Sequence, residues 1–206
     1  MPPAADATEL PLFPLQTVLC PGGLLELKVF EARYLDLMGR CLRESRPFGV
    51  LGLQRGSEVR RPNQPVVLES VGTQAELMDV DSAQAGILLV RCRGTERFEV
   101  LSSRQQGDGL WLAQTRPIDA DPSVAPTPAL AAAARALADA IVALDSQGAM
   151  PFLQPHRLDD AGWVANRWVE LLPLPLAAKQ QLLELRDPLM RLELVDEFLR
   201  KNGVLP

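Results

Sequence analysis

The side chains that most enzymes use for catalysis are scarce in this sequence. It contains one histidine, His156, together with three cysteines and very few lysines. A single imidazole excludes mechanisms that need two, and it excludes a histidine-rich metal site. His156 follows Pro155 in a predicted loop, which is typical of a surface residue rather than a general base. Cys20, Cys41 and Cys92 each lie in an apolar context that predicts burial, away from an activating base.

Phosphate-binding and serine–lysine chemistry are also missing. No Gly-x-x-x-x-Gly-Lys-Ser/Thr segment occurs, and Gly107-Asp-Gly109 has neither a third glycine nor a following helix. Lys28, Lys179 and Lys201 lie on amphipathic segments that predict solvated side chains. The acidic pair Asp159–Asp160 precedes a helical stripe, which favours helix capping over a weak cation site. We therefore expect no catalytic residue, no metal and no cofactor.

Charge and cysteine usage restrict the partners and the compartment. The 206 residues carry a net charge of −5, which disfavours non-specific binding to a phosphate backbone. A local basic patch is still possible at Arg91, Arg93 and Arg97. The favoured interpretation is that these side chains lie on the solvated outer face of a sheet. An odd number of cysteines without a Cys-x-x-Cys pair predicts free thiols. With neither a signal peptide nor a membrane-length apolar run, the sequence predicts a cytoplasmic protein.

The elements expected in the first half are strands with one helix, as in a barrel. After an extended apolar start, glycine-rich turns at Asp81–Gly86, Gly94–Thr95 and Gly107–Gly109 separate the strands, and Arg60–Pro65 is a loop. Gly72 predicts a bulge. The helix spans Glu31–Ser45 with an apolar stripe of Tyr34, Leu35, Met38, Cys41 and Leu42. The strands are Leu24–Val29, Phe48–Gln54, Val66–Asp81, Ile87–Arg93, Arg97–Ser103 and Leu110–Ile118.

The second half changes to helical periodicity. A proline-rich linker at residues 119–128 separates a β subdomain at 8–118 from a helical bundle at 129–203. Thr127-Pro128 and Asp187-Pro188 each pair a capping residue with proline at the first helical position. Between them, Gly148 ends one predicted helix, a second begins near Asp159 or Asp160, and a third spans Leu176–Leu185. We expect about four helices joined by short turns.

Four residues are candidates for binding. Arg33 and Tyr34 lie at the start of the predicted first helix, where Glu31 and Arg33 either brace that helix or form a polar rim beside an exposed apolar groove. The bracing role is the favoured interpretation. Trp163 lies off the main stripe of its helix, where packing between the two halves is favoured over capping a groove. Trp111 is the fourth candidate, whereas the other aromatic residues, including Phe30, are expected in the core.

Several separated segments together resemble a known family. The N-terminal part of this pattern is Leu10-Pro-Leu-Phe-Pro-Leu15, Val18-Leu-Cys-Pro-Gly22 and Leu27-Lys-Val-Phe-Glu-Ala-Arg-Tyr34. Further markers are Val71–Leu77, Gly94-Thr-Glu-Arg-Phe98, Trp168–Leu174 and Lys179–Glu184. Their order, over roughly residues 8 to 202, resembles the N-terminal domain of Lon proteases. Cys20 and Lys28 depart from the family pattern without changing the fold assignment.

The resemblance implies an α+β fold, with a PUA-like six-stranded pseudo-barrel, one packed helix and a C-terminal helical bundle. In complete Lon proteases this region contributes to substrate recognition and assembly. The motor and the peptidase are absent from this chain, so the resemblance implies a stand-alone, non-catalytic module. Its expected partners are unfolded or extended polypeptide segments and a protease system.

Two other functions stay open at this point. PUA-like barrels often bind RNA, for which Arg91, Arg93, Arg97 and Trp111 would be the best residues, although the acidic balance disfavours it. A small-molecule enzyme that uses carboxylates alone would need a deep pocket joining two of them. The ligand, the oligomeric state and the position of any groove do not follow from the sequence.

Overall fold

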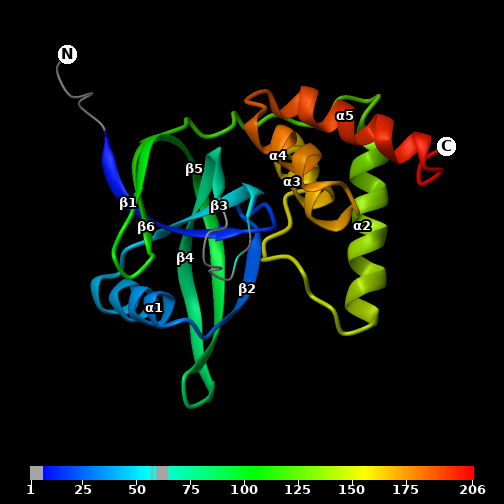
Figure 1. Ribbon diagram of the computed structural model, residues 1–206. Coiled ribbons are helices and arrows are strands. Elements are labelled where there is room, and N and C mark those ends of the chain that lie inside the picture. Colours follow the sequence, from blue (N-terminus) through cyan, green and yellow to red (C-terminus); the bar gives the residue numbers. More distant parts are fainter. Residues whose placement is uncertain (1–6, 57, 59–64) are drawn as a thin grey trace. The chain divides into compact units, whose positions relative to one another are not determined.

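The structure, a computed structural model, describes residues 7–56, 58 and 65–206. The chain divides into two compact units, Met1–Asp119 and Ala120–Pro206, which we call the β unit and the helical unit (Figure 1). Most of the loop predicted at Arg60–Pro65 lies outside the described residues. The predicted α+β class, with a six-stranded sheet and a helical C-terminal part, is confirmed. Its likeness to the PUA fold stays a prediction.

The β unit contains one sheet in the order β2-β5-β4-β3-β1-β6, and β6 also pairs with β5. Five of the six strands therefore close into a ring, and β2 is attached to the outside of that ring through β5 alone. The β1–β3 pair is parallel and all other pairs are antiparallel. The strands are β1 (Thr8–Leu15), β2 (Leu24–Val29), β3 (Phe48–Arg55), β4 (Val67–Gln84), β5 (Ile87–Gln105) and β6 (Trp111–Pro117).

One strand prediction was wrong. The turn expected at Gly94–Thr95 does not exist, and Ile87–Gln105 is a single long strand. Gly94 is required for another reason, because a Cβ atom there would lie 2.3 Å from the carbonyl oxygen of Cys20. The glycine thus permits the close approach of the chain segment that enters β2, and the chain does not change direction at this position. The sequence pattern alone does not separate these two uses of glycine.

The turn predicted at Asp81–Gly86 is shorter than expected, because β4 continues to Gln84, whereas the irregularity predicted at Gly72 is present. The β3–β4 pairing shifts in register directly after the Gly72–Leu51 pair, as the predicted bulge requires. A Cβ atom on Gly72 would lie 2.4 Å from the carbonyl oxygen of Val50. The β4–β5 hairpin turns at Ala85–Gly86, with Gly86 at a φ of 79°, and extends beyond the rest of the sheet in Figure 1.

Helix α1 (Ala32–Glu44) packs Tyr34, Leu37, Met38 and Cys41 into the core of the β unit. The predicted stripe was wrong at Leu42, whose side chain is 53% exposed. The buried positions follow a spacing of three and four residues, which turns Leu42 toward solvent. The strand residues of this core include Phe13, Leu15, Val29, Phe48, Val50, Val90 and Cys92.

The helical unit contains α2 (Ala131–Ser146), α3 (Ala161–Leu171), α4 (Leu176–Glu184) and α5 (Pro188–Lys201), in agreement with the four predicted helices. Asp187 caps α5 as predicted, since its carboxylate accepts hydrogen bonds from the Leu189 and Met190 amides. Asp160 caps α3. The cap predicted at Thr127 was wrong, because a turn between Thr127 and Leu130 displaces the start of α2.

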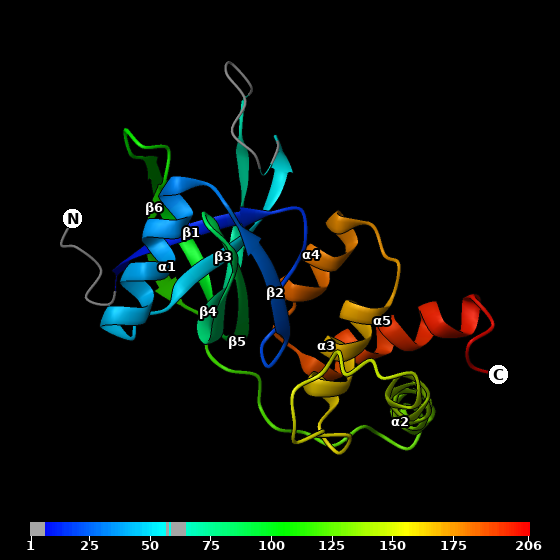
Figure 2. The same cartoon turned by 90° about the horizontal axis from the view of Figure 1, so that it is seen from below.

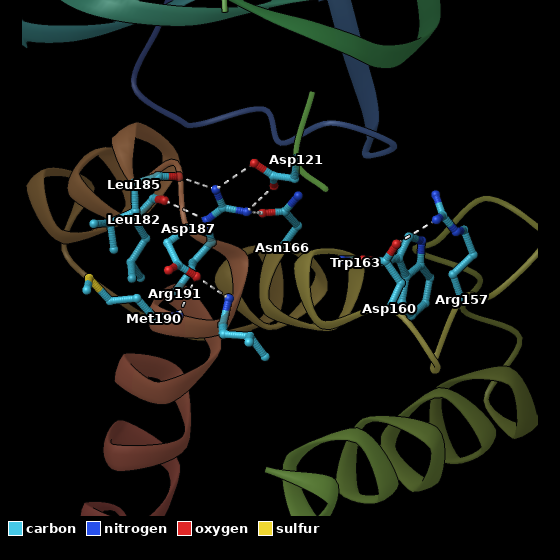
Figure 3. A network of polar contacts seen from close by, with 11 residues as sticks. Asp121, Arg157, Asp160, Trp163, Asn166, Leu182, Leu185, Asp187, Met190 and Arg191 are labelled. Atoms are coloured by element: carbon cyan, nitrogen blue, oxygen red, sulfur yellow. Dashed lines mark hydrogen bonds and ion pairs between the residues drawn. The ribbon is translucent and has the colours of Figure 1, made fainter. Parts of the chain in front are cut away.

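A buried arginine ties the start of the helical unit to its last helix (Figure 3). Arg191 is 1% exposed. It donates hydrogen bonds to the Asp121 carboxylate at 2.6 Å and to the Asn166 side-chain oxygen at 3.2 Å. It also donates to the backbone carbonyls of Leu182 and Leu185. The proline-rich segment that contains Asp121 is thus bonded to the helices that follow it.

Candidate functional site

Strand β2 begins with a glycine turn that attaches it to β5. The Gly22 amide donates to the carbonyl of Gly94 at 2.8 Å, and the Gly94 amide donates to the carbonyl of Gly23 at 2.9 Å. From there β2 alternates, with Leu25, Leu27 and Val29 packed on the core and Glu26 and Lys28 exposed. Charged residues between apolar ones are typical of an edge strand.

A groove of about 390 Å³ runs along β2. Seven consecutive residues, from Leu25 to Glu31, line it. Side chains alternate between the faces of a strand, so a groove on one face would be lined by every second residue. Consecutive lining residues place this groove along the edge of the strand, and β2 is the outer strand of the sheet beside β5 (Figure 2). The opposite wall consists of Phe13, Leu15, Thr17, Tyr34 and Glu58.

An aromatic stack supports the wall opposite β2. The rings of Phe13 and Tyr34 lie 3.9 Å apart between centroids, at an interplanar angle of 15°. The guanidinium of Arg33 lies 4.6 Å from the Tyr34 ring centroid, in a cation–π arrangement. Burial raises the pKa of the Tyr34 hydroxyl above its ordinary 10.0, against an opposite effect of Arg33. Tyr34 therefore stays neutral near pH ~7 and forms part of a mostly apolar wall.

Most charges around the groove have partners. Glu31 and Arg33 form an ion pair at 2.9 Å, and Glu26 lies 3.3 Å from Arg91. Glu31 is the N-cap residue of α1, but its side chain makes no capping hydrogen bond and lines the groove instead. The ion pair between Glu31 and Arg33 is compatible with the predicted bracing of the helix start, and Glu31 also lines the groove, so both expected roles stay predictions. Arg33 is 8% exposed, and its Nε has no acceptor in the described part of the chain.

Phe30 is the residue that the sequence analysis misplaced. It was expected in the core, but it is 52% exposed and lines the groove at the end of β2. Phe13, Leu25 and Leu27 were also missed as site residues. The alternation of Leu25 and Leu27 with Glu26 and Lys28 was the available signal, since charges between apolar residues mark an edge strand. A large exposed aromatic side chain directly after such a strand indicates a contact surface.

The four candidate binding residues do not converge. Arg33 and Tyr34 lie beside the groove. Trp111 lies on β6, where it packs against a second apolar cluster around Leu12 and Phe98. Trp163 belongs to α3 of the helical unit, and its ring contacts Phe152 edge-on.

The basic positions considered for RNA binding do not form one exposed patch. Arg97 is 4% exposed. Arg91 and Arg93 are exposed as predicted, but they pair with Glu26 and Glu76, the latter at 2.8 Å. The three arginines proposed for RNA binding from the sequence are therefore buried or paired with carboxylates.

The nucleophile candidates lie in environments that do not activate them. Cys20, Cys41 and Cys92 are free and buried. Burial raises the pKa of the Cys92 thiol from its ordinary 9.0 to about 12, and Cys41 next to it acts in the same direction. His156 lies against Trp163, with the rings 5.7 Å apart. Within residues 7–56, 58 and 65–206, no three histidine, cysteine or acidic side chains gather in a way that could hold a metal ion.

The helical unit has an apolar groove of its own, of about 400 Å³, between α4 and α5. Leucines and Phe198 dominate its walls. Helices satisfy their own backbone hydrogen bonds, so this groove offers side-chain contacts alone. None of the helices in the described residues is both long and apolar enough to cross a bilayer.

Comparison with known proteins supports the resemblance seen in the sequence. The sequence model of the ATP-dependent protease La (LON) substrate-binding domain matches residues 9–201. A Lon N-terminal domain protein from Xanthomonas campestris has 34% identity and a TM-score of 0.72, over 91% of this chain and 96% of that chain. The N-terminal domain of a Mycobacterium avium complex Lon protease has 17% identity and a TM-score of 0.64, over 92% and 97%. The search of curated proteins gave no match.

Proposed function

The chain belongs to the family of the Lon substrate-binding domain, and on this premise we propose that it is a non-catalytic module that binds unfolded or extended polypeptide segments. The observation that carries the proposal is the groove along the outer edge of β2. Its walls are largely apolar, and Phe30 at its end is 52% exposed. A mostly apolar concavity of 300–1,000 Å³ is the usual form of a binding site, and the groove, at about 390 Å³, falls in that range.

The surroundings of the reactive side chains support a non-catalytic role. The three thiols are buried, and the pKa of Cys92 lies far above the range of a nucleophilic cysteine. His156 lies in the helical unit, whereas all three cysteines lie in the β unit. We expect the purified chain neither to hydrolyse ATP nor to cleave peptides. Turnover that depends on its own residues would overturn this part of the proposal.

A cytoplasmic location and a protease system as a partner belong to the same proposal. Free thiols suit a reducing compartment. The matched family is named for binding the substrates of a protease, which supports polypeptides as the ligand class. A pull-down from cell lysate, with the captured proteins identified, tests whether a protease is among the partners.

Titration with an unfolded protein tests the binding function. A reduced and alkylated protein, and short apolar peptides, are titrated with the purified chain by fluorescence anisotropy. Phe30→Ser should weaken binding roughly tenfold or more, because burying a phenylalanine ring is worth about that factor. The matched control is Leu42→Ser, since Leu42 is 53% exposed on α1 and does not line the groove.

Two outcomes count against the proposal. One is the absence of binding even at high micromolar concentrations of the chain. The other is an equal loss of affinity in the Phe30 and Leu42 variants, which would mean that exposed apolar residues bind anywhere on the surface. Circular dichroism of both variants checks that neither exposed substitution disturbs the fold.

A further inference from the structure

Strand β2 has a neighbour on one side only. Each strand of the closed ring pairs with at least two other strands, whereas β2 pairs with β5 and with no other described strand. The opposite edge of β2 therefore presents backbone amides and carbonyls without a strand partner. Such an edge is a template for pairing with another extended chain.

The hydrogen-bond pattern indicates which backbone groups are open. The amide of Gly94 donates to the carbonyl of Gly23, so this carbonyl points toward β5. Direction alternates along an antiparallel strand, and the β2–β5 register has no shift from Leu24 to Val29. The Gly23 amide donates to the Cys20 carbonyl, so only the carbonyl of Gly23 faces β5. The amide of Leu24 points opposite to that carbonyl, and by alternation the backbone groups of Leu24, Glu26 and Lys28 point away from β5, toward the open edge.

The groove lies along this same edge. Consecutive residues from Leu25 to Glu31 line it, so a bound segment could contact both the side chains and the backbone of β2. Across the groove, Phe13, Leu15 and Thr17 contribute alternate residues of one chain face. An occupant is thus offered backbone hydrogen bonds on one side and apolar contacts on the other.

Resting on the function proposed above, we propose that the groove binds its polypeptide by strand addition. The occupant is an extended segment whose backbone pairs with the open edge of β2. Its residues alternate, so that every second side chain is apolar and contacts the Leu25, Leu27 and Phe13 wall. The residues between them lie beside Glu26 and Lys28 and are polar.

Charge complementarity defines the occupant further. Glu26, Glu31 and Glu58 already interact with Arg91, Arg33 and the Gln16 amide. Lys28 forms no ion pair with any residue that the structure describes, and it is exposed. Opposite charges on directly opposed strand positions attract. The preferred segment therefore carries an aspartate or glutamate at the polar position beside Lys28.

Two backbone-methylated peptides test strand addition. The parent is a labelled peptide of alternating valine or leucine and threonine, with one central threonine replaced by glutamate, and each derivative carries N-methyl groups at every second residue, in opposite frames. Only one frame directs its amides toward β2, so one derivative should lose roughly tenfold or more in affinity while the other binds like the parent. Equal affinities of both derivatives, or equal losses, would contradict strand addition.

Charge reversal provides a second measurement. Lys28→Glu should weaken the glutamate peptide and strengthen a matched lysine peptide, each by roughly three- to fivefold. Lys201→Glu in the helical unit is the control and should change neither affinity. No change on Lys28 reversal would exclude the assigned charge preference.

The outcomes separate strand addition from the proposed function. If the methylated peptides bind alike while Phe30→Ser still weakens binding, the groove binds by side chains alone. In that case strand addition fails and the proposed function stands. If neither the parent peptide nor the unfolded protein binds at all, the proposed function itself fails.

Discussion

Two of the buried arginines in this protein, Arg191 in the helical unit and Arg33 in the β unit, differ in the number of their polar partners. Arg191 in the helical unit donates to two side chains and two backbone carbonyls. Arg33 in the β unit has one carboxylate partner and an aromatic ring, and its buried Nε has no acceptor among the described residues. Beside Arg33, the outer edge of β2 also lacks strand partners.

The difference separates a structural network from a binding site. Buried polar groups that are fully hydrogen-bonded stabilise one packing arrangement, and removing one member leaves the others unpaired. An open strand edge beside an apolar groove contributes little to the stability of the free fold, and in the proposed function it gains hydrogen-bond partners from a bound polypeptide. Variants in the first region should change stability, and variants in the second should change affinity.

The largest expected effect is on the Arg191 network. Arg191→Ala removes the donor to the Leu182 and Leu185 carbonyls and the ion pair with Asp121, which should cost about 3–5 kcal/mol of unfolding free energy. Arg104→Ala is the control, because Arg104 and its ion-pair partner Glu9 are both exposed, and such a pair should be worth about 1 kcal/mol or less. Urea unfolding followed by tryptophan fluorescence measures both, and similar losses in the two variants would refute the distinction.

A close backbone contact should give the next largest effect. Gly94→Ala places a Cβ atom 2.3 Å from the Cys20 carbonyl, where the backbone must move, at a cost of about 1–3 kcal/mol. Gly107→Ala meets no atom within 4 Å and should be nearly neutral. Equal thermal midpoints for the two variants would show that the entry to β2 is not closely packed.

Raising the pH should reduce stability through the buried thiols of the β unit, because all three cysteines lie there. The pKa of Cys92 is raised to about 12, so the folded chain keeps a proton that the unfolded chain releases near its ordinary 9.0. Its contribution is therefore complete below about pH 9 and is lost as pH rises toward 12, by up to about 1.4 kcal/mol per pH unit. Urea unfolding at about pH 8 and about pH 10 should show a steeper loss in the parent than in Cys92→Ala. Identical pH slopes would contradict the burial of this thiol.

The smallest effect on stability is expected at the groove. Phe30→Ser should change the unfolding free energy by roughly 0.5 kcal/mol or less, since the ring is about half-exposed. Chemical denaturation of this variant, beside the binding titration, shows whether affinity and stability separate here. A loss of several kcal/mol would move Phe30 into the folding core and away from the site.

The sequence predicted the parts of the fold that depend on local patterns. The helices follow apolar spacing, and the caps at Asp160 and Asp187 follow from residue type. Gly94 was wrongly assigned to a turn. Its close contact is with the carbonyl of Cys20, which is distant in sequence, and a local pattern does not reveal such a contact. Thr127-Pro128 was wrongly assigned to a helix cap. The residue types fit a cap, but a turn from Thr127 to Leu130 precedes the helix.

The candidate site was only partly predictable for the same reason. Arg33 and Tyr34 were chosen at the start of the predicted first helix, and they lie beside the groove. Trp111 and Trp163 were chosen as aromatic residues, and they pack elsewhere in the two units. Whether a strand has an open edge depends on which distant segments pair with it, so the role of β2 and the exposure of Phe30 needed the structure.

Amide hydrogen exchange in β2, with and without the alternating peptide, tests the central claim most directly. The amides of Glu26 and Lys28 should exchange rapidly in the free protein, and saturating peptide should slow them by roughly tenfold or more. The amides of Leu25 and Leu27, directed toward β5, should be protected in both states. Unchanged exchange at Glu26 and Lys28 while the peptide is bound would contradict pairing at this edge.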